Sequence, residues 1–504
     1  MKIAFRVDAS SQIGTGHFMR CLTLADALKQ RGVQTRVLSR HLPGYLRDML
    51  VAKEHEFMLL NGRSVEALQD DLAHSHWLGT SQLVDAQDSI QALSDQVWDW
   101  LVVDHYALDI RWESLLRKTA KNILVIDDIA DRQHDGDVLL DQNFYTDMDT
   151  RYAGKVPAYC RLLLGLRYAL LRDEFRQLRE QVRPRTGPVR KVLVFFGGVD
   201  ADNYTARAIE ALANIGGQDL HVDVVVGAQH PHLKEIELTC ADHGFVCHVQ
   251  TNRMAELMAS ADLAIGAAGS ASWERCCMGL PALAFPTASN QRPLVEAAAV
   301  RGLLYAPRSQ SNGTPSLELH LKALLDNPRL LESVSRRSVE AVDGRGVQRV
   351  LRAIGSNSIA IREATQADSE KLFIWRNHSS VRAVSRNVDP IEKPAHDAWL
   401  SAVISDSDRA LLIGECRGEV VGVVRFDVRA GEAEVSIYLV PDHQGEGYGP
   451  ELLLATEQWL AESYSDVRII RAEVLGCNQP SHSLFRTCGY QVRATLYAKE
   501  VHRV

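Results

Sequence analysis

A histidine stands between a pair of glycines and the start of a predicted helix near the beginning of the chain. In the run SSQIGTGHFMR, Gly14 and Gly16 precede His17, a strand-like segment comes before them, and a helical pattern follows. Glycines let the backbone turn sharply and approach a ligand closely, and a helix N-terminus presents unpaired N–H groups that favour an anion. His17 is therefore a candidate catalytic group beside a charged substrate. The alternative is a histidine that only begins a helix.

A second ligand-binding pattern lies near the middle of the chain. A strand ends at GAAGS, where Gly269 and Ser270 open a helix that carries Glu274 one turn later. A phosphate is favoured at such a helix start, and Glu274 is placed to accept hydrogen bonds from ribose hydroxyls. The run NQRP, with Asn290 and Gln291, begins the next helix. Either stretch alone is also compatible with ordinary turn chemistry in an α/β protein.

A third pattern is the glycine loop QGEGYG between a predicted strand and a predicted amphipathic helix. Alternating glycines let backbone N–H groups converge on one concavity, which suits a pyrophosphate. The candidate cofactor-binding residues of this loop are Gln444, Gly445, Glu446, Gly447, Tyr448 and Gly449. About thirty residues later, NQPSHSLFRTCGY adds Asn478 and Ser481.

The elements that must position these residues fall into three blocks. Two blocks alternate short apolar strands with helical stretches, which predicts two doubly wound parallel sheets with a ligand cleft at the carboxyl ends of their strands. The third block has hairpin-like strands and its own helices, which predicts an α+β module. We expect an N-terminal Rossmann-like domain at 1–175, a nucleotide-binding Rossmann-like domain at 176–355 and an α+β domain at 356–504.

Composition narrows the classes of function. The chain has 504 residues, an ordinary apolar content and a formal net charge of −8, and it shows no clustered basic footprint for nucleic acid. No apolar run is long enough to predict a membrane span, and the N-terminus lacks the plan of a signal peptide. The nine cysteines are scattered without a C-x-x-C pair. This predicts a cytoplasmic protein with reduced thiols, no metal, no nucleic-acid partner and no membrane partner.

The third block resembles the acyl-CoA-binding core of the GCN5-related N-acetyltransferase (GNAT) family, because the glycine loop and the N-x-x-S-x-x-L-F-x-x-x-G-Y pattern occur in order. The resemblance implies acetyl-CoA as co-substrate and direct attack of a neutral amine on the thioester. Glu434, on the strand facing the loop, is the candidate base, and an exposed structural glutamate is the alternative. The family often has tyrosine where this chain has Phe485, so Ser481, His482, Tyr438 and solvent all remain open as the acid.

The first two blocks resemble two-Rossmann glycosyltransferases of the B type. The motifs RVDASSQIGTGHFMR, VVDHYALD, IDDIADRQHDGDVLLDQN, GLRYALLRDEF and FFGGVDADNYT are similar, in that order, to the UDP-sugar hydrolases of pseudaminic acid biosynthesis. The resemblance implies that His17 is the general base that activates water against the anomeric carbon, with inversion. The candidate substrate-binding residues in these motifs are Arg6, Asp8, Gly14, Gly16, Asp104, Tyr106 and Gly198. Asp8 and the pair Asp104-His105 stand at strand ends near the cleft, where they are candidates to orient His17 or to bind sugar hydroxyls, and helix capping is the alternative role.

Together the resemblances imply a bifunctional enzyme of pseudaminic acid biosynthesis, and through it of flagellin glycosylation. The acetyltransferase would acetylate the 4-amino group of a UDP-linked aminosugar, and the hydrolase would release UDP from the diacetamido product. Three alternatives stay open at this point: a true glycosyltransferase fused to an acetyltransferase, the same chemistry in a legionaminic acid pathway, and a non-catalytic UDP-sugar-binding module.

Overall fold

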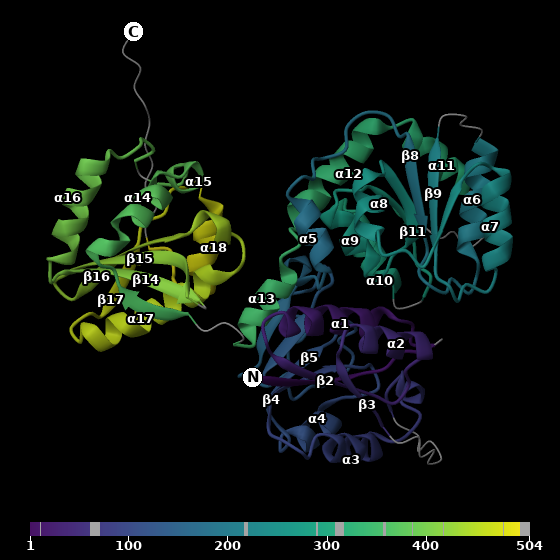
Figure 1. The fold of residues 1–504 in the computed structure, drawn as a ribbon, viewed down its shortest axis with the longest axis horizontal. Helices are drawn as coiled ribbons and strands as arrows, with labels where there is room; N and C mark the ends of the chain where they lie inside the picture. The colour runs from purple at the N-terminus through teal and green to yellow at the C-terminus, as the bar shows by residue number, and fades with distance from the viewer. Residues whose placement is uncertain are drawn as a thin grey trace, which may run out of the picture. The chain divides into compact units, whose positions relative to one another are not determined.

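The computed structural model describes residues 1–10, 12–60, 71–215, 220–288, 291–307, 317–355, 359–385, 387–416, 418–476 and 478–493. The contacts between residues divide the chain into two compact units, Met1–Ile354 and Gly355–Val504. The first unit is an α/β structure with two parallel sheets, and the second is an α+β structure with a mixed sheet (Figure 1).

The first sheet has the strand order β3-β2-β1-β4-β5-β6-β7, and its pairings are all parallel in the described part of the chain. Its strands are β1 (Lys2–Val7), β2 (Gln34–Ser39), β3 (Glu56–Leu59), β4 (Trp98–Asp104), β5 (Ala120–Ile126), β6 (Val138–Asp141) and β7 (Arg161–Leu164). The runs of Val, Ile and Leu in β4, β5 and β6 are typical of strands that are covered on both faces. Sequence analysis did not anticipate β3, β6 and β7, because four-residue apolar runs carry too little periodicity to reveal a strand.

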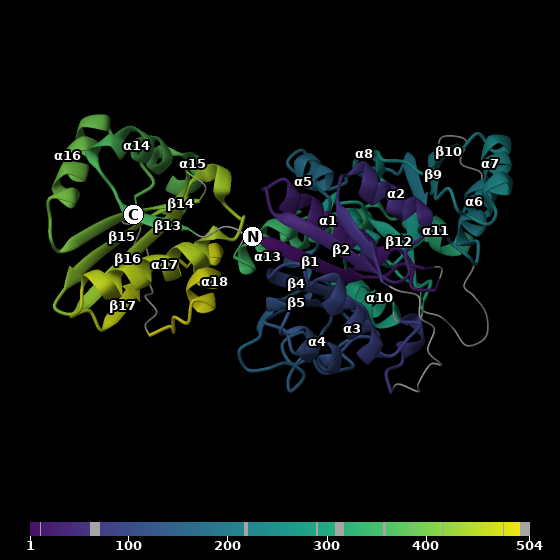
Figure 2. The same ribbon diagram turned by 60° about the horizontal axis from the view of Figure 1, so that its bottom comes forward.

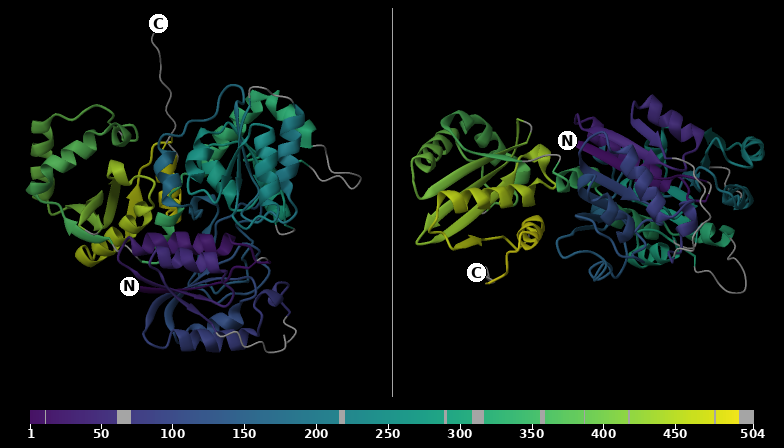
Figure 3. Two further views of the ribbon diagram at one scale, coloured as in Figure 1. Left: turned by 45° about the vertical axis from the view of Figure 1, so that its right-hand side comes forward. Right: turned by 90° about the horizontal axis from the view of Figure 1, so that it is seen from below.

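Helices cover both faces of this sheet (Figure 3). Apolar residues of α1 (Gly16–Lys29), α2 (Gly44–Ala52) and α13 (Gly346–Ala353) share one buried cluster with the sheet. Residues of α3 (Gln82–Ala92) and α4 (Ile110–Leu116) belong to another buried cluster against it. The first strand feeds directly into the glycine turn and α1, so the fold places His17 at the carboxyl edge of the sheet.

The second sheet has the order β10-β9-β8-β11-β12, again parallel throughout the described residues. Its strands are β8 (Lys191–Phe195), β9 (His221–Val226), β10 (Val246–Val249), β11 (Leu263–Ala267) and β12 (Ala282–Phe285). Helix α5 (Asp173–Arg179) precedes β8, and the helices between and after the strands are α6 (Tyr204–Ile215), α7 (Leu233–Asp242), α8 (Met254–Ser260), α9 (Ala271–Cys277), α10 (Arg292–Arg301), α11 (Leu317–Leu325) and α12 (Pro328–Ala341).

Helix α13 crosses back from the second sheet to the first. Its apolar face, with Val347, Val350 and Leu351, is buried in the cluster that contains α1. Gly346 permits this return, because a Cβ there would lie 2.2 Å from the carbonyl oxygen of Ala169. The predicted nucleotide-binding domain at 176–355 therefore includes a helix that packs on the first sheet. The division at residues 175 and 176 remains a prediction.

The second unit is built on a sheet of order β13-β14-β15-β16-β17, antiparallel except for the parallel pair β16 and β17. Its strands are β13 (Ala360–Glu363), β14 (Arg409–Cys416), β15 (Glu419–Arg429), β16 (Glu432–Leu439) and β17 (Ile469–Ala472), and its helices are α14 (Ser369–Asn377), α15 (Ser379–Arg382), α16 (Lys393–Ile404), α17 (Tyr448–Ser463) and α18 (Gln479–Thr487). Figure 2 shows α14 and α16 on one face of this sheet and α17 on the other. The glycine loop thus connects β16 to α17.

Candidate functional site

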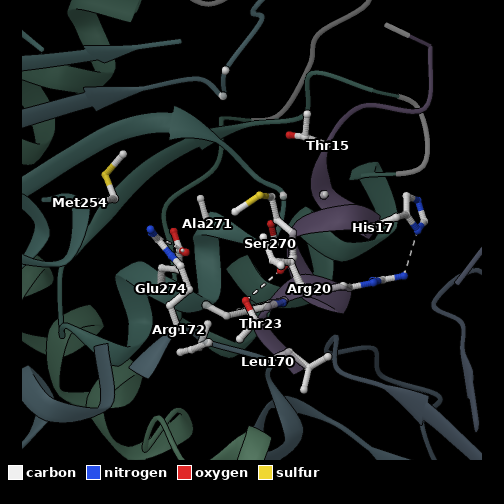
Figure 4. Close-up of a pocket in the computed structure, with 18 of the residues that line it drawn as sticks. Thr15, His17, Arg20, Thr23, Leu170, Arg172, Met254, Ser270, Ala271 and Glu274 are labelled. Carbon is white, nitrogen blue, oxygen red and sulfur yellow. Dashed lines mark hydrogen bonds and ion pairs between the residues drawn. The ribbon is translucent and has the colours of Figure 1, made fainter. Parts of the chain in front are cut away.

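A cleft of about 950 Å³ opens at the carboxyl edges of the two parallel sheets of the first unit (Figure 4). This is where ligands bind in open α/β sheets. One wall comes from the first sheet and includes Gly14, Thr15, Gly16, His17, Arg20, Tyr106 and Asp128. The opposite wall comes from the second sheet and includes Gly198, Gly269, Ser270, Glu274 and Gln291. The structure thus brings together residues predicted from distant parts of the sequence.

The imidazole of His17 is held by a carboxylate of the neighbouring strand. Its Nδ1 lies 2.5 Å from Oδ1 of Asp104, the last residue of β4. Asp104 is fully buried, and although burial by itself raises the pKa of its carboxyl, the charge of Arg20 and the contact with His17 hold that pKa well below its ordinary value. An ionised carboxylate only accepts hydrogen bonds, so Nδ1 carries the proton and Nε2 carries the lone pair in the neutral ring. His17 can therefore act as a base toward a ligand.

Arg20 completes this arrangement one helical turn after His17. Its Nε and Nη2 donate to the two oxygens of Asp104 at 2.6 and 2.7 Å, and its Nη1 donates to Asp128 at 2.8 Å. Asp128 follows β5, so α1 and the two neighbouring strands β4 and β5 meet through one guanidinium. Sequence analysis did not single out Arg20 or Asp128. The available signal for Arg20 was its i+3 spacing from His17, which places both side chains on one face of the helix.

Tyr106 and nearby rings surround the imidazole. The Tyr106 ring meets His17 edge-on with centroids 4.5 Å apart, and the Tyr106 hydroxyl donates to Asp128. Trp77 stacks on Tyr106 at 5.6 Å, and His74 lies 5.3 Å from Tyr106. Sequence analysis included Tyr106 as a substrate-binding candidate but did not single out Trp77 or His74. These rings place an apolar wall beside the proposed base.

Arg6 and Asp8 lie outside the lining of the cleft. Both are fully buried, and Arg6 makes a two-pronged ion pair with Asp8 at 2.7 and 3.0 Å and also bonds Asp85. Asp8 further accepts from Ser39 at 2.9 Å, and His105 lies 3.2 Å from it. These charges are used inside the protein to fix the carboxyl ends of β1 and β4. We therefore leave Arg6 and Asp8 out of the proposed substrate site.

The small residues of the second sheet form an open surface of the cleft. A Cβ placed on Gly198 would meet nothing within 4 Å, and one placed on Gly269 would meet only the Gln291 amide at 3.7 Å. Gly269 and Ser270 end the turn between β11 and α9, and the Ser270 side chain makes no capping hydrogen bond. This leaves room for a ligand to approach the backbone closely.

Glu274 faces the cleft from α9 and contacts Arg172, in the segment that connects the two sheets. Arg172 Nη2 lies 3.4 Å from its Oε1, and burial raises the pKa of Glu274 above its ordinary value. The Oε1 of Gln291 accepts from the backbone N–H of Thr287 at 2.9 Å, which orients its amide. Asn290 falls outside the described residues. Arg172 was not anticipated as a lining residue, since the sequence around it is typical of a charged linker helix.

The glycine loop of the second unit has the backbone that its sequence predicts. Gly445 and Gly447 have φ of +76° and +88°, values that other residues rarely adopt, and α17 begins directly after Gly447. Gln444 precedes this turn, and Glu446 lies 3.1 Å from the ring of His443. Two left-handed glycines separated by Glu446, just before a helix N-terminus, make a concavity that suits an anion.

The later part of the acyl-CoA pattern has local structural roles. The side chain of Asn478 caps α18 by accepting from the backbone N–H of Ser481 at 3.2 Å. A Cβ on Gly449 would lie 3.2 Å from Leu484, so this glycine lets α18 pack closely on α17. Tyr448 is buried. The binding roles predicted for Asn478, Ser481, Tyr448 and Gly449 remain predictions.

Glu434 lies on β16, where its side chain is exposed and opposite Asp427 of β15 in the register. Ser436 is exposed on the same strand, and burial raises the pKa of Tyr438. Phe485 is buried and its ring meets Tyr490 at 4.9 Å, so it belongs to the core of this unit. The group that protonates the departing thiolate therefore stays open among Ser481, His482, Tyr438 and solvent.

Across the residues that the structure describes, no helix is long and apolar enough to cross a membrane. Within the same ranges, no group of three or more His, Cys, Asp or Glu side chains is arranged to hold a metal ion.

Comparisons with known proteins match both units. Residues 191–346 match the glycosyltransferase family 28 C-terminal domain, and residues 373–490 match the acetyltransferase (GNAT) family. The chain is 24% identical over 273 residues to UDP-2,4-diacetamido-2,4,6-trideoxy-beta-L-altropyranose hydrolase of Campylobacter jejuni, which covers 54% of this chain and 86% of that protein. It is also 24% identical over 360 residues to the spore coat polysaccharide biosynthesis protein SpsG of Bacillus subtilis, covering 69% of this chain and 96% of that protein.

Among solved structures, MurG of Acinetobacter baumannii is 16% identical, covers 70% of this chain and 99% of its own, and aligns with a TM-score of 0.46. The sequence similarities and the matched domains confirm the resemblance to a UDP-sugar hydrolase fused to a GNAT acetyltransferase that the motifs indicated. The two parallel sheets followed by a mixed sheet confirm the predicted fold class. The chain thus combines two parts. One part is homologous to a UDP-sugar hydrolase and includes a glycosyltransferase family 28 C-terminal domain, and the other is a C-terminal acetyltransferase domain of the GNAT family.

Proposed function

We propose that the chain is a bifunctional enzyme that acts twice on one nucleotide sugar. The GNAT domain acetylates the 4-amino group of UDP-4-amino-4,6-dideoxy-N-acetyl-β-L-altrosamine with acetyl-CoA. The first unit then hydrolyses UDP-2,4-diacetamido-2,4,6-trideoxy-β-L-altropyranose to UDP and the free sugar. The observation that carries the hydrolytic half is the His17–Asp104 pair at 2.5 Å on the wall of the cleft.

In the hydrolytic step, water attacks the anomeric carbon and Nε2 of His17 takes its proton. Water is a poor nucleophile, so its activation and its fixed position supply most of what the protein must add. Asp104 holds the ring in the tautomer that leaves Nε2 unprotonated. In this proposal His17 acts from one wall of the cleft and UDP is bound at the other, so attack comes from the face opposite UDP and inverts the anomeric carbon.

The second sheet holds the leaving group. The open turn at Gly269 and Ser270 accommodates the pyrophosphate, Gly198 leaves space beside it, and Glu274 and Gln291 face the ribose and base. UDP spreads its charge over the pyrophosphate, so binding it in a pre-formed anion site stabilises the departing group without a strong acid.

In the acetyl-transfer step, the amine of the sugar attacks the thioester carbonyl and CoA leaves as the thiol. The turn at Gly445 and Gly447 is the proposed cradle for the CoA pyrophosphate. Glu434 is the proposed base that removes the amine proton, directly or through water. Glycine adopts the positive φ of Gly445 and Gly447 readily, so this turn can bring its backbone N–H groups close to a bound phosphate.

A glycosyltransferase is the second candidate, because residues 191–346 match a glycosyltransferase domain. The test supplies the full-length chain with acetyl-CoA and the UDP-4-amino sugar and follows the products by NMR with time. The proposal expects the acetylated UDP-sugar first, then UDP and the free diacetamido sugar without any added acceptor. UDP release that requires a sugar acceptor favours the second candidate and contradicts the proposal.

A further inference from the structure

We propose that Arg20 is a positioning residue that keeps His17 neutral, and hence basic, while His17 is bonded to a carboxylate. This inference deepens the proposed hydrolysis and rests on it. A carboxylate hydrogen-bonded to an imidazole favours the doubly protonated imidazolium, which has no lone pair and cannot act as a base. A neighbouring positive charge opposes this effect and extends to lower pH the range in which His17 accepts a proton from water.

Arg20 supplies that charge at the required place. Its Nη2 lies 3.2 Å from Nδ1 of His17 and 2.7 Å from Oδ1 of Asp104, the same oxygen that the imidazole contacts. The guanidinium therefore neutralises the carboxylate and also sits beside the ring as a like charge to any imidazolium. Both effects disfavour a second proton on His17. Figure 4 shows the guanidinium extended along α1 to the imidazole.

The other charged and titratable groups near the imidazole do not replace Arg20. Asp104 and Tyr106 face the ring from β4 and the turn after it. Asp128, after β5, is one contact further away and is bonded to both Arg20 and Tyr106. His74 contacts Tyr106 and is itself titratable. Arg132 is a second permanent cation, with its guanidinium 5.7 Å from the centroid of the Tyr106 ring, and it is paired with Asp127 and Asp131. Arg20 is the permanent cation that lies beside Nδ1 of His17 and is bonded to Asp104.

The bond to Asp128 fixes where the cation lies. Arg20 is 7% exposed, and its three bonded nitrogens are shared between Asp104 and Asp128, so the guanidinium is clamped between two strands. Clamping matters because a free arginine would move toward the pyrophosphate of a bound UDP-sugar. The structure therefore assigns Asp128 to hold Arg20 and Arg20 to hold the dyad in its basic form.

The test measures the protonation of His17 directly in the ligand-free, full-length protein. Histidine labelled with ¹³C and ¹⁵N is titrated by NMR, and the His17 signals are identified by their loss in His17→Ala. We expect Arg20→Gln to move the protonation midpoint of His17 upward by about one to two pH units. Arg20→Lys, which keeps the charge, should stay closer to the wild type than Arg20→Gln. Lys29→Gln, an exposed cation on the same helix, should change nothing.

The same variants are then compared by the pH dependence of kcat/KM for UDP release. In Arg20→Gln the acidic limb should move upward by the same interval, so the rate is about tenfold or more below wild type on the acid side and recovers at higher pH. If Arg20→Gln does not fold, Arg20→Gln with Asp128→Asn removes one charge of each sign and should show the same shift. A folded variant whose His17 midpoint equals that of the wild type overturns the proposal, as does a uniform loss of rate at every pH.

Failure of the two proposals can be told apart. If the wild type releases no UDP but the NMR midpoints differ as expected, the role of Arg20 stands and the hydrolase assignment falls. If UDP release is normal and the midpoints coincide, the hydrolase assignment stands and the role of Arg20 falls.

Discussion

Asparagine at position 104 would remove the charge that orients His17 while preserving the size of the side chain. In the wild type, the two oxygens of Asp104 accept from His17 Nδ1, Arg20 Nε and Arg20 Nη2 at 2.5 to 2.7 Å. An amide has one acceptor oxygen and one N–H donor group. If its oxygen stays with the guanidinium, its NH₂ faces the imidazole, and His17 must adopt the tautomer with the proton on Nε2. The base then has no lone pair toward the cleft.

The expected loss follows from this change of tautomer. We expect kcat for UDP release to fall by about 10²- to 10⁴-fold, the usual range for losing a correctly oriented general base. The KM for the UDP-sugar should change little, because Asp104 does not line the cleft. Stability should fall by about 1–3 kcal/mol, since Arg20 loses the charge of residue 104 and one of its two hydrogen bonds to it but keeps Asp128.

The assay compares Asp104→Asn with the wild type in initial rates of UDP release, and acetyl transfer by the same preparation is the internal control. A thermal melt establishes that the variant is folded. A folded Asp104→Asn enzyme with kcat within about threefold of the wild type would refute the reasoning that Asp104 sets the tautomer. A large change in KM with unchanged kcat would place Asp104 in ground-state binding instead.

Three further predictions address other parts of the chain. Glu274→Ala should raise the KM for the UDP-sugar about tenfold with little change in kcat, because ribose is bound alike in ground and transition states; steady-state kinetics in which only kcat changes would contradict this. Gly447→Val should abolish acetyl transfer and the calorimetric binding of acetyl-CoA, since the φ of Gly447 is +88° in the proposed cradle. As a control, Gly418→Val, at φ +81° in a hairpin turn, should leave acetyl transfer and acetyl-CoA binding intact. Burial, followed by the charge of Asp128, raises the pKa of Asp141 to about 7. The free energy of unfolding therefore falls progressively from about pH 4 to pH 7, as Asp141 ionises. Asp141→Asn should raise the melting temperature at pH 8 more than at pH 5, and an equal or opposite effect would count against this.

The sequence predicted the parts of the site that depend on local pattern. The glycine turn before His17, the turn at Gly269 and the glycine loop before α17 each have a strand, a turn and a helix in immediate succession, so local rules suffice to place them. Asp104 was selected because a carboxylate at a strand end lies at the edge where ligands bind.

The missed features depend on contacts between distant segments. Arg20 becomes informative only when β4 and β5 bring Asp104 and Asp128 to it. Asp8 was selected by the same strand-end rule as Asp104, but it pairs with Arg6, and Asp85 of α3 reaches β1 and encloses the charge of Arg6. The return of α13 to the first sheet likewise depends on packing that a linear pattern does not carry.

The central claim is that water activated by His17 displaces UDP from the anomeric carbon. The most direct measurement runs the reaction of the UDP-diacetamido sugar in H₂¹⁸O, with no sugar acceptor, and determines by mass spectrometry which product contains the label. The account predicts that UDP forms without ¹⁸O, that the label enters the free sugar, and that His17→Ala slows this by about 10²- to 10⁴-fold while acetyl transfer continues. Label in the β-phosphate of UDP, or UDP release only when a sugar acceptor is added, would contradict it.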